Sequence, residues 1–123
     1  MRNLQREGAI KSARVAAVMQ AVDRRDFVTS RDTSEAYHDN PLSIDYNVTI
    51  SAPHMHGYCM EWLEKKLQPG ARVLDVGCGS GYLLATFYEL CKKPDGSAAV
   101  FGIEHVEELA EFSRVNLRKS FAT

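Results

Sequence analysis

The 123-residue sequence has few cysteines, no long apolar run and no block of like charge. Its three cysteines form no C-x-x-C pair, which argues against a disulfide framework and favours free thiols in a reducing compartment. No apolar stretch approaches the roughly 18 residues of a membrane helix, and Arg2, Arg6 and Glu7 stand where a secretory signal would be apolar. These absences predict a cytoplasmic domain with no membrane partner.

The charge balance excludes a further group of partners. Fifteen basic and sixteen acidic side chains give a formal net charge of −1, with no run of five Lys or Arg and no basic helix. Nucleic acid is therefore not an expected partner. The length suits one domain at most, because domains usually span roughly 100–200 residues.

The most informative stretch is 73–81, Val-Leu-Asp-Val-Gly-Cys-Gly-Ser-Gly. A largely apolar, partly β-branched run predicts a buried strand, and three glycines set two apart predict a loop that something approaches closely. A helix starting at about Ser80 would direct free backbone N–H groups into the same space. The pattern indicates a nucleotide-like cofactor; a tight strand-helix turn without a ligand is the alternative.

The glycine spacing narrows the choice of cofactor. The dinucleotide fingerprint G-x-G-x-x-G fails, because the third glycine comes one residue early and Tyr82 takes its place. A phosphate-binding G-x-x-x-x-G-K-[ST] is absent. Asp75 completes D-x-G-x-G-x-G with Gly77, Gly79 and Gly81, which resembles motif I of S-adenosyl-L-methionine (SAM) methyltransferases.

Hydrophobic periodicity places these motifs in an α/β chain. We expect a Rossmann-like core over residues 46–123 and a helical N-terminal extension over residues 1–45. The expected elements are a helix capped by Ser12, an extended segment 46–50, a helix capped by Ser51 with Pro53 in its first turn, strand 72–76, helix 83–90, strand 98–104 and helix 106–117. Residues 23–26 are interpreted as a solvated charged turn and residues 29–44 as an irregular connection. The order of the later elements predicts a right-handed parallel β-α-β unit.

Two further groups of side chains are candidates for chemistry. Glu104 ends the second strand, so it should face one crevice with the glycine loop and could accept both hydroxyls of a ribose, with His105 beside it. His54, His56 and Cys59 fit no common zinc spacing, so no metal site is predicted. No Ser/His/Asp or Cys/His catalytic set is apparent, and Ser51 by itself indicates only a helix cap.

Residues 48–56, Val-Thr-Ile-Ser-Ala-Pro-His-Met-His, followed by the glycine loop, resemble the protein-L-isoaspartate (D-aspartate) O-methyltransferases. The resemblance extends from Asn3-Leu4 to Leu117-Arg118-Lys119. It implies a repair enzyme, monomeric at full length, that uses SAM to methylate the free carboxyl group of isoaspartyl and D-aspartyl residues in damaged proteins and peptides. The ester then cyclises to a succinimide, which offers a route back to normal aspartate.

The resemblance also assigns site residues. Ser51 is the implied active-site serine. Together with the motif I loop, the implied cofactor contacts are Val48, Thr49, Ile50, Ser51, His56, Asp75, Gly77, Gly79, Ser80, Gly81, Glu104 and His105. The sequence departs from the family at Cys78, where serine is common, and at Glu104, where aspartate is common. Because a carboxylate nucleophile with a pKa of about 4 is already ionised at neutral pH, no general base is needed, and Ser51 would orient the substrate.

Length is the main departure from the family. The chain supplies only the first two strands of the larger sheet that such methyltransferases use, so we expect it to be truncated after the second core strand and its helix, and inactive alone. Two other functions stay open: a SAM methyltransferase for another carboxylate or small molecule, and a non-catalytic interaction module that pairs through its open sheet edge.

Overall fold

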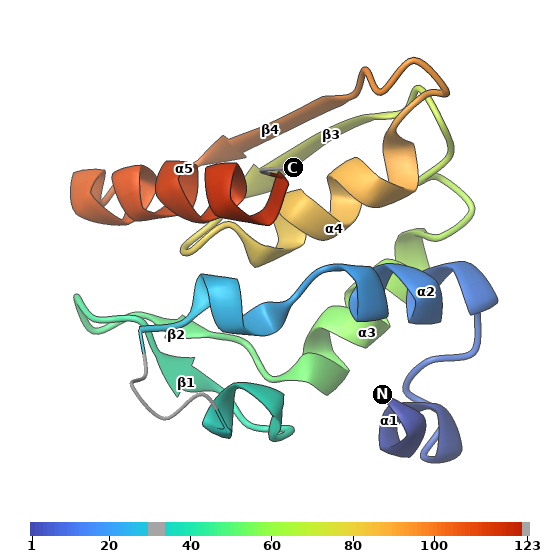
Figure 1. The fold of residues 1–123 in the computed structure, drawn as a ribbon, viewed down its shortest axis with the longest axis horizontal. Helices are drawn as coiled ribbons and strands as arrows, with labels where there is room; N and C mark the ends of the chain where they lie inside the picture. The colour runs from blue at the N-terminus through green and yellow to red at the C-terminus, as the bar shows by residue number, and fades with distance from the viewer. Residues whose placement is uncertain (30–33, 122–123) are drawn as a thin grey trace.

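The structure is a computed structural model and describes residues 1–29 and 34–121. Its centre is a parallel pair of strands, β3 (Arg72–Val76) and β4 (Ala99–Ile103), connected through α4 (Tyr82–Cys91) and followed by α5 (Glu107–Phe121). The predicted parallel β-α-β unit is confirmed, and strand β3 has the predicted bounds. Figure 1 shows β3 and β4 side by side along one side of the molecule, with α4 and α5 against them and α2 beyond α4.

The N-terminal elements pack on the opposite side of α4 from the strands. They are α1 (Arg2–Arg6), α2 (Ala13–Ala21), the 3-10 helices η1 (Arg24–Phe27) and η2 (Glu35–Tyr37), and α3 (Pro53–Leu63). Helix α2 is capped as predicted, since the Ser12 hydroxyl accepts hydrogen bonds from the N–H groups of Arg14 and Val15. Apolar side chains of α1, α2, α3 and α4 form one buried cluster, which fixes these helices to the core.

A short hairpin interrupts the segment that was interpreted as irregular. Strand β1 (Leu42–Ser43) pairs antiparallel with β2 (Thr49–Ile50), so the extended segment predicted over 46–50 is only two residues long. Three consecutive non-glycine residues, Asp45, Tyr46 and Asn47, make the turn with positive φ. The irregular interpretation is wrong for residues 35–37, which form η2, and for residues 42–43, because elements this short leave no readable periodicity. Residues 30–33 of that segment lie outside the described residues.

The helix after Ser51 begins differently from the prediction. Its N-cap residue is Ala52, which makes no side-chain cap, and Pro53 occupies the first turn as expected. The capping acceptor is instead Asp39, whose carboxylate accepts a 2.9 Å hydrogen bond from the His54 N–H. The predicted Ser51 cap is therefore wrong, because an acceptor from a remote segment takes the position.

The two faces of the strand pair are covered unequally. Helix α4 packs on one face, whereas Leu74 and Val76 of β3 and Phe101 and Ile103 of β4 are 53–75% exposed on the other. Leu74 pairs with Phe101 and Val76 with Ile103, so the exposed side chains form one apolar surface. In the described residues, one face of the strand pair is thus covered and the other is largely exposed.

Candidate functional site

A pocket of about 100 Å³ opens at the carboxyl ends of the strands, between the β1–β2 hairpin and the glycine loop. Nine of the predicted cofactor residues line it: Val48, Thr49, Ile50, Ser51, His56, Asp75, Gly77, Gly79 and Ser80. Segments separated by about twenty residues in the sequence thus meet at one site. A larger hollow of about 750 Å³ lies near Pro69 and Lys93, at the amino ends of the strands. In parallel α/β sheets ligands bind outside the carboxyl ends, which selects the smaller pocket.

The glycine loop takes its shape from positive φ angles and from bonds to the end of β4. Gly77, Gly79 and Gly81 have φ of 81°, 53° and 92°, which glycine adopts without strain. The N–H of Gly77 donates a 2.7 Å hydrogen bond to the Ile103 carbonyl. Gly79 and Gly81 are left-handed, and α4 begins at Tyr82, two residues after the expected start at about Ser80 and around the helix predicted over 83–90.

Glu104 lies directly beside this loop. One oxygen of its carboxylate accepts a 2.9 Å hydrogen bond from the Gly79 N–H, and the other accepts one from the Val106 N–H at 3.2 Å. Burial alone would raise its pKa, but these backbone bonds outweigh the burial and hold the pKa below its usual value. The predicted proximity of Glu104 to the loop is confirmed; its contact with a ribose stays a prediction.

Asp75 is a second carboxyl group in the same region and behaves oppositely. Asp75 lies near the end of β3 and is half-buried. Burial is the larger cause and the neighbouring charge of Glu104 the smaller cause that raise its pKa. The two acids thus have their pKa values pushed apart, with Glu104 the one that stays ionised to lower pH. Their combined charge favours a cationic or hydroxyl-bearing ligand at the loop.

Three predicted cofactor residues, Glu104, His105 and Gly81, are not among the residues that line the pocket. The side chain of His105 is 92% exposed, with its Nδ1 3.3 Å from a Glu104 oxygen. Gly81 lies behind the loop, where an added Cβ would stand 2.7 Å from the Ser113 hydroxyl. The structure therefore leaves His105 exposed beside Glu104 and gives Gly81 a packing role.

Ser51 presents an exposed side chain at the pocket wall. Within residues 1–29 and 34–121 its hydroxyl makes none of the hydrogen bonds that the structure records, since Asp39 caps α3 in its place. Its backbone carbonyl accepts a 2.9 Å hydrogen bond from an Arg24 guanidinium nitrogen. The hydroxyl is free to bind a ligand while the backbone is held.

Behind this wall lies a group of aromatic and basic side chains, of which the sequence singled out His56 but not the buried Arg24. Arg24 is only 5% exposed, which corrects the interpretation of residues 23–26 as a fully solvated turn. The His56 ring stacks on Tyr82 with ring centres 4.6 Å apart, and Phe27 meets the same Tyr82 ring edge-on at 5.7 Å. Burial, then the charge of Arg24, lowers the pKa of His56 to about 3, so its ring is neutral at physiological pH. The sequence feature that could have indicated this group is Tyr82, which stands where the dinucleotide fingerprint has its third glycine.

Among the described residues, no group of three or more His, Cys, Asp or Glu side chains is arranged to hold a metal ion. The two histidines of the Ser51 region have other partners: His54 Nδ1 lies 2.9 Å from the Asp39 carboxylate, and His56 stacks on Tyr82. In the part of the chain that the structure describes, no helix has the length and apolarity to cross a membrane.

A parallel β-α-β unit with a glycine loop at one strand end and an acid at the next defines the Rossmann-like class of α/β domains that bind nucleoside-type cofactors. Comparison with known proteins then identifies the group within this class. Residues 1–123 match the family model of the protein-L-isoaspartate (D-aspartate) O-methyltransferases, and the chain belongs to this family.

Individual relatives agree with the family model. The chain is 53% identical over 121 residues to protein-L-isoaspartate O-methyltransferase 1 of Arabidopsis thaliana and 40% identical over 117 residues to the enzyme of that name from Caenorhabditis elegans. These matches cover 98% and 95% of the chain but only 50% and 49% of the relatives. The chain thus spans about half the length of the curated relatives it matches.

A solved structure matches the fold as well. A Plasmodium falciparum protein described as a protein-L-isoaspartate O-methyltransferase, in complex with S-adenosyl-L-homocysteine, superposes with a TM-score of 0.88 at 36% identity. The match covers 98% of this chain and 54% of that protein. The α/β methyltransferase fold expected from the sequence is confirmed over the matched residues.

Proposed function

We propose that the chain contributes the SAM-binding half of a methyltransferase site that acts on the free carboxyl group of isoaspartyl and D-aspartyl residues in proteins and peptides. The observation that carries the proposal is the free Ser51 hydroxyl beside the glycine-loop pocket. Support comes from the family to which the chain belongs and from the S-adenosyl-L-homocysteine complex of the Plasmodium falciparum protein. We place the cofactor-binding core in residues 46–123 and treat residues 1–45 as an extension that supports it.

The residues present suit a nucleoside cofactor. A Cβ at Gly79 would stand 3.3 Å from Ile44 Cδ1 and narrow the pocket, so glycine keeps space for a ligand there. Glu104 supplies a carboxylate for ribose hydroxyls, and Asp75 faces the same loop. The pocket of about 100 Å³ is smaller than the roughly 300–1,000 Å³ usual for ligand sites, so only part of SAM would be enclosed by it. The rest would lie over the rim formed by Glu104 and His105.

The reaction requires little acid-base catalysis by the protein. The sulfonium of SAM supplies an electrophilic methyl group, and the substrate carboxylate is ionised at neutral pH. What remains is to align the carboxylate oxygen with the methyl carbon, and such positioning accounts for much of enzymatic rate enhancement. Ser51 would donate a hydrogen bond to the carboxylate and fix its orientation. His56 is neutral and buried, and therefore serves the pocket as an aromatic wall and not as a base.

The test measures methyl transfer from labelled SAM to an isoaspartyl peptide, with the aspartyl peptide of the same sequence as the control. Two proteins are compared: the 123-residue chain, and a chimera in which it replaces the matching 121 residues of the Arabidopsis thaliana relative. Transfer selective for the isoaspartyl peptide in either protein supports the proposal. SAM binding with no transfer in both proteins rejects the proposed substrate, and no SAM binding in either rejects the cofactor.

Ser51→Ala provides the residue-level test in whichever protein is active. We expect kcat/KM for the isoaspartyl peptide to fall about tenfold to a hundredfold, because the substrate carboxylate loses an orienting donor. The Kd for SAM should stay within about threefold, since the hydroxyl is one group among many at the pocket. Ser97→Ala, which removes an exposed hydroxyl remote from the site, is the matched control. Wild-type turnover in Ser51→Ala would exclude the role assigned to this hydroxyl.

A further inference from the structure

Arg24 is a buried cation between two backbone segments that are far apart in the sequence. One guanidinium nitrogen donates to the Ser51 carbonyl at 2.9 Å, and the other donates to the Asn40 carbonyl at 3.2 Å. Its side chain belongs to η1, a 3-10 helix capped by Asp23. The planar fork of arginine thus fixes the distance between residues 40 and 51.

The surroundings of Arg24 explain how the charge is tolerated. The guanidinium carbon lies 5.9 Å from the centre of the Tyr82 ring, within the range of a cation–π contact, and one of its nitrogens is 3.5 Å from His56 Nδ1. Since arginine is always a donor, Nδ1 of the neutral His56 accepts here and the proton sits on Nε2. Taking a cation out of water costs several kcal/mol. Among the described residues no carboxylate lies within ion-pair distance of Arg24, although the charge of Asp39 favours its charged form. The guanidinium is held by backbone carbonyls and by the Tyr82 ring.

The same two segments are joined a second time. The Asp39 carboxylate accepts hydrogen bonds from the N–H and the ring of His54, so residues 39–40 hold both sides of the Ser51 turn. Asp39 releases the Ser51 hydroxyl from capping, and Arg24 holds the Ser51 carbonyl. Asp39 thus leaves the Ser51 side chain free, and Arg24 fixes the backbone from which that side chain projects.

We propose that Arg24 is a positioning residue for methyl transfer: by holding the Ser51 carbonyl, it aims the Ser51 hydroxyl at the substrate carboxylate. This inference rests on the function proposed above. Arg24 touches neither substrate nor cofactor in this scheme and acts only through Ser51. A point charge would not suffice, because a lysine ammonium lacks the planar fork that reaches both carbonyls.

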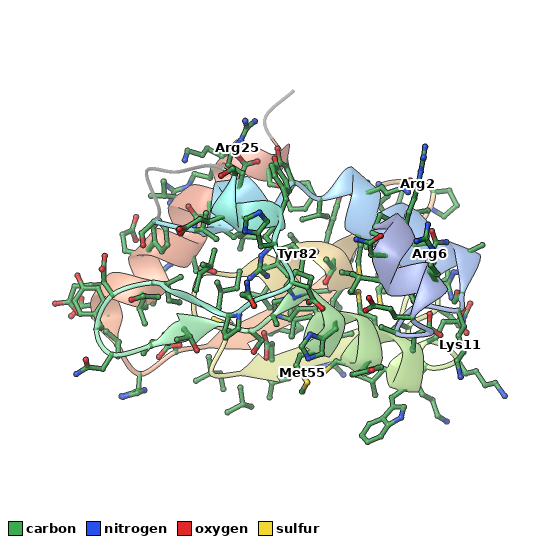
Figure 2. The ribbon with its side chains drawn as sticks, turned by 90° about the horizontal axis from the view of Figure 1, so that it is seen from below. Arg2, Arg6, Lys11, Arg25, Met55 and Tyr82 are labelled. Atoms are coloured by element: carbon green, nitrogen blue, oxygen red, sulfur yellow. The ribbon has the colours of Figure 1, made fainter. Side chains whose placement is uncertain are left out.

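The experiment compares Arg24→Lys, which keeps the charge and loses the fork, with Arg25→Met on the same turn. The Arg25 side chain is 52% exposed and pairs with Asp23, and Figure 2 shows it projecting from the edge of the molecule while Tyr82 lies inside. We expect Arg24→Lys to lower kcat/KM for the isoaspartyl peptide at least about tenfold with SAM Kd within about threefold, and Arg25→Met to leave both unchanged. Circular dichroism and the unfolding midpoint confirm that each variant folds.

A double-mutant cycle separates positioning from general support of the fold. If Arg24 acts through Ser51, Arg24→Lys on the Ser51→Ala background should change kcat/KM by less than about threefold. Full additivity of the two substitutions overturns the proposal. So does unchanged turnover in Arg24→Lys alone while Ser51→Ala is impaired.

A measurement that does not depend on turnover distinguishes failure of the Arg24 proposal from failure of the proposed function. If the wild-type protein binds SAM and methylates no isoaspartyl peptide, the proposed function fails, and backbone NMR then tests Arg24. The carbonyl carbon resonances of Ser51 and Asn40 should shift in Arg24→Lys and stay in place in Arg25→Met. Resonances that match the wild type in both variants overturn the assignment of Arg24 to Ser51.

Discussion

The glycine loop, residues 77–81, and the Ser51 segment, residues 48–56, meet at one pocket but are held in different ways. The loop carries its positive φ angles on glycine and bonds to the adjacent end of β4. The Ser51 segment is fixed by Arg24 and Asp39, side chains that come from earlier parts of the chain. The glycine loop is therefore shaped by its glycine backbone and by bonds inside the β-α-β unit, whereas the Ser51 segment depends on side chains that precede that unit.

The largest expected effect is at the glycine loop. Gly81→Ala forces a non-glycine residue to φ of +92° and places its Cβ 2.7 Å from the Ser113 hydroxyl. Left-handed φ costs about 1–2 kcal/mol and overpacking about 1–3 kcal/mol, so we expect a loss of about 3 kcal/mol in the free energy of unfolding. Denaturant unfolding measures it.

Gly8→Ala is the matched control for Gly81→Ala. Its φ is +80°, and an added Cβ would meet nothing within 4 Å. Only the backbone cost of about 1–2 kcal/mol should appear. Equal losses for the two variants would show that the contact with Ser113 relaxes without cost.

The contrast also explains what could be predicted from the sequence. Strand β3, the parallel pairing with β4 and the approach of Glu104 to the loop follow from apolar runs and glycine spacing, which are local signals. The cap of α3 could not be predicted, because Ser51 and the distant Asp39 are both suitable acceptors and only tertiary packing decides between them. Burial of Arg24 was missed for the same reason: its neighbours in sequence are charged, while its neighbours in space are aromatic rings.

The next prediction concerns the neutral His56 behind the Ser51 segment. Its pKa is about 3 in the folded chain against 6.5 in an unfolded one, so the unfolded state binds the extra proton as pH falls. Stability is full above pH 6.5 and declines toward pH 3. At pH 5 the loss relative to pH 7.5 should be about 2 kcal/mol.

His56→Phe keeps an aromatic ring against Tyr82 and removes the titrating group. Urea unfolding at pH 5 and pH 7.5 should then show about 2 kcal/mol less pH-dependent loss than in the wild type. An undiminished loss in the variant would mean that other groups cause the pH dependence and that His56 is accessible to water.

A smaller effect is expected at the remote cap. Asp39→Ala removes the acceptor for the His54 N–H and should lower the free energy of unfolding by about 1 kcal/mol at pH 7, while Asp39→Asn keeps an acceptor and should cost less. Burial raises the pKa of Asp39, but the hydrogen bonds from His54 outweigh it and the pKa lies below its usual value. A lowered acid pKa means that the stabilisation exists above about pH 4 and disappears as pH falls through the folded-state pKa. Thermal unfolding of the three proteins at pH 7 and pH 3 checks this: the difference between wild type and Asp39→Ala should shrink at pH 3, and an undiminished difference would contradict it.

The smallest predicted effect comes from placing glycine at a positive-φ position of the hairpin before Ser51, as the glycine loop already does. Tyr46 has φ of +54° in the hairpin that leads to Ser51, a conformation that the glycine loop reserves for glycine. Tyr46→Gly should raise the free energy of unfolding by about 0.5 kcal/mol, because relief of the left-handed strain exceeds the entropy lost by glycine on folding. Tyr58→Gly is the control: Tyr58 has similar exposure, 47% against 54%, but lies inside α3, where glycine costs about 1 kcal/mol. A gain in the free energy of unfolding for Tyr46→Gly and a loss for Tyr58→Gly would show that strain at the turn is stored locally. A loss in both variants would show that contacts of the Tyr46 ring stabilise the chain by more than its backbone strain costs.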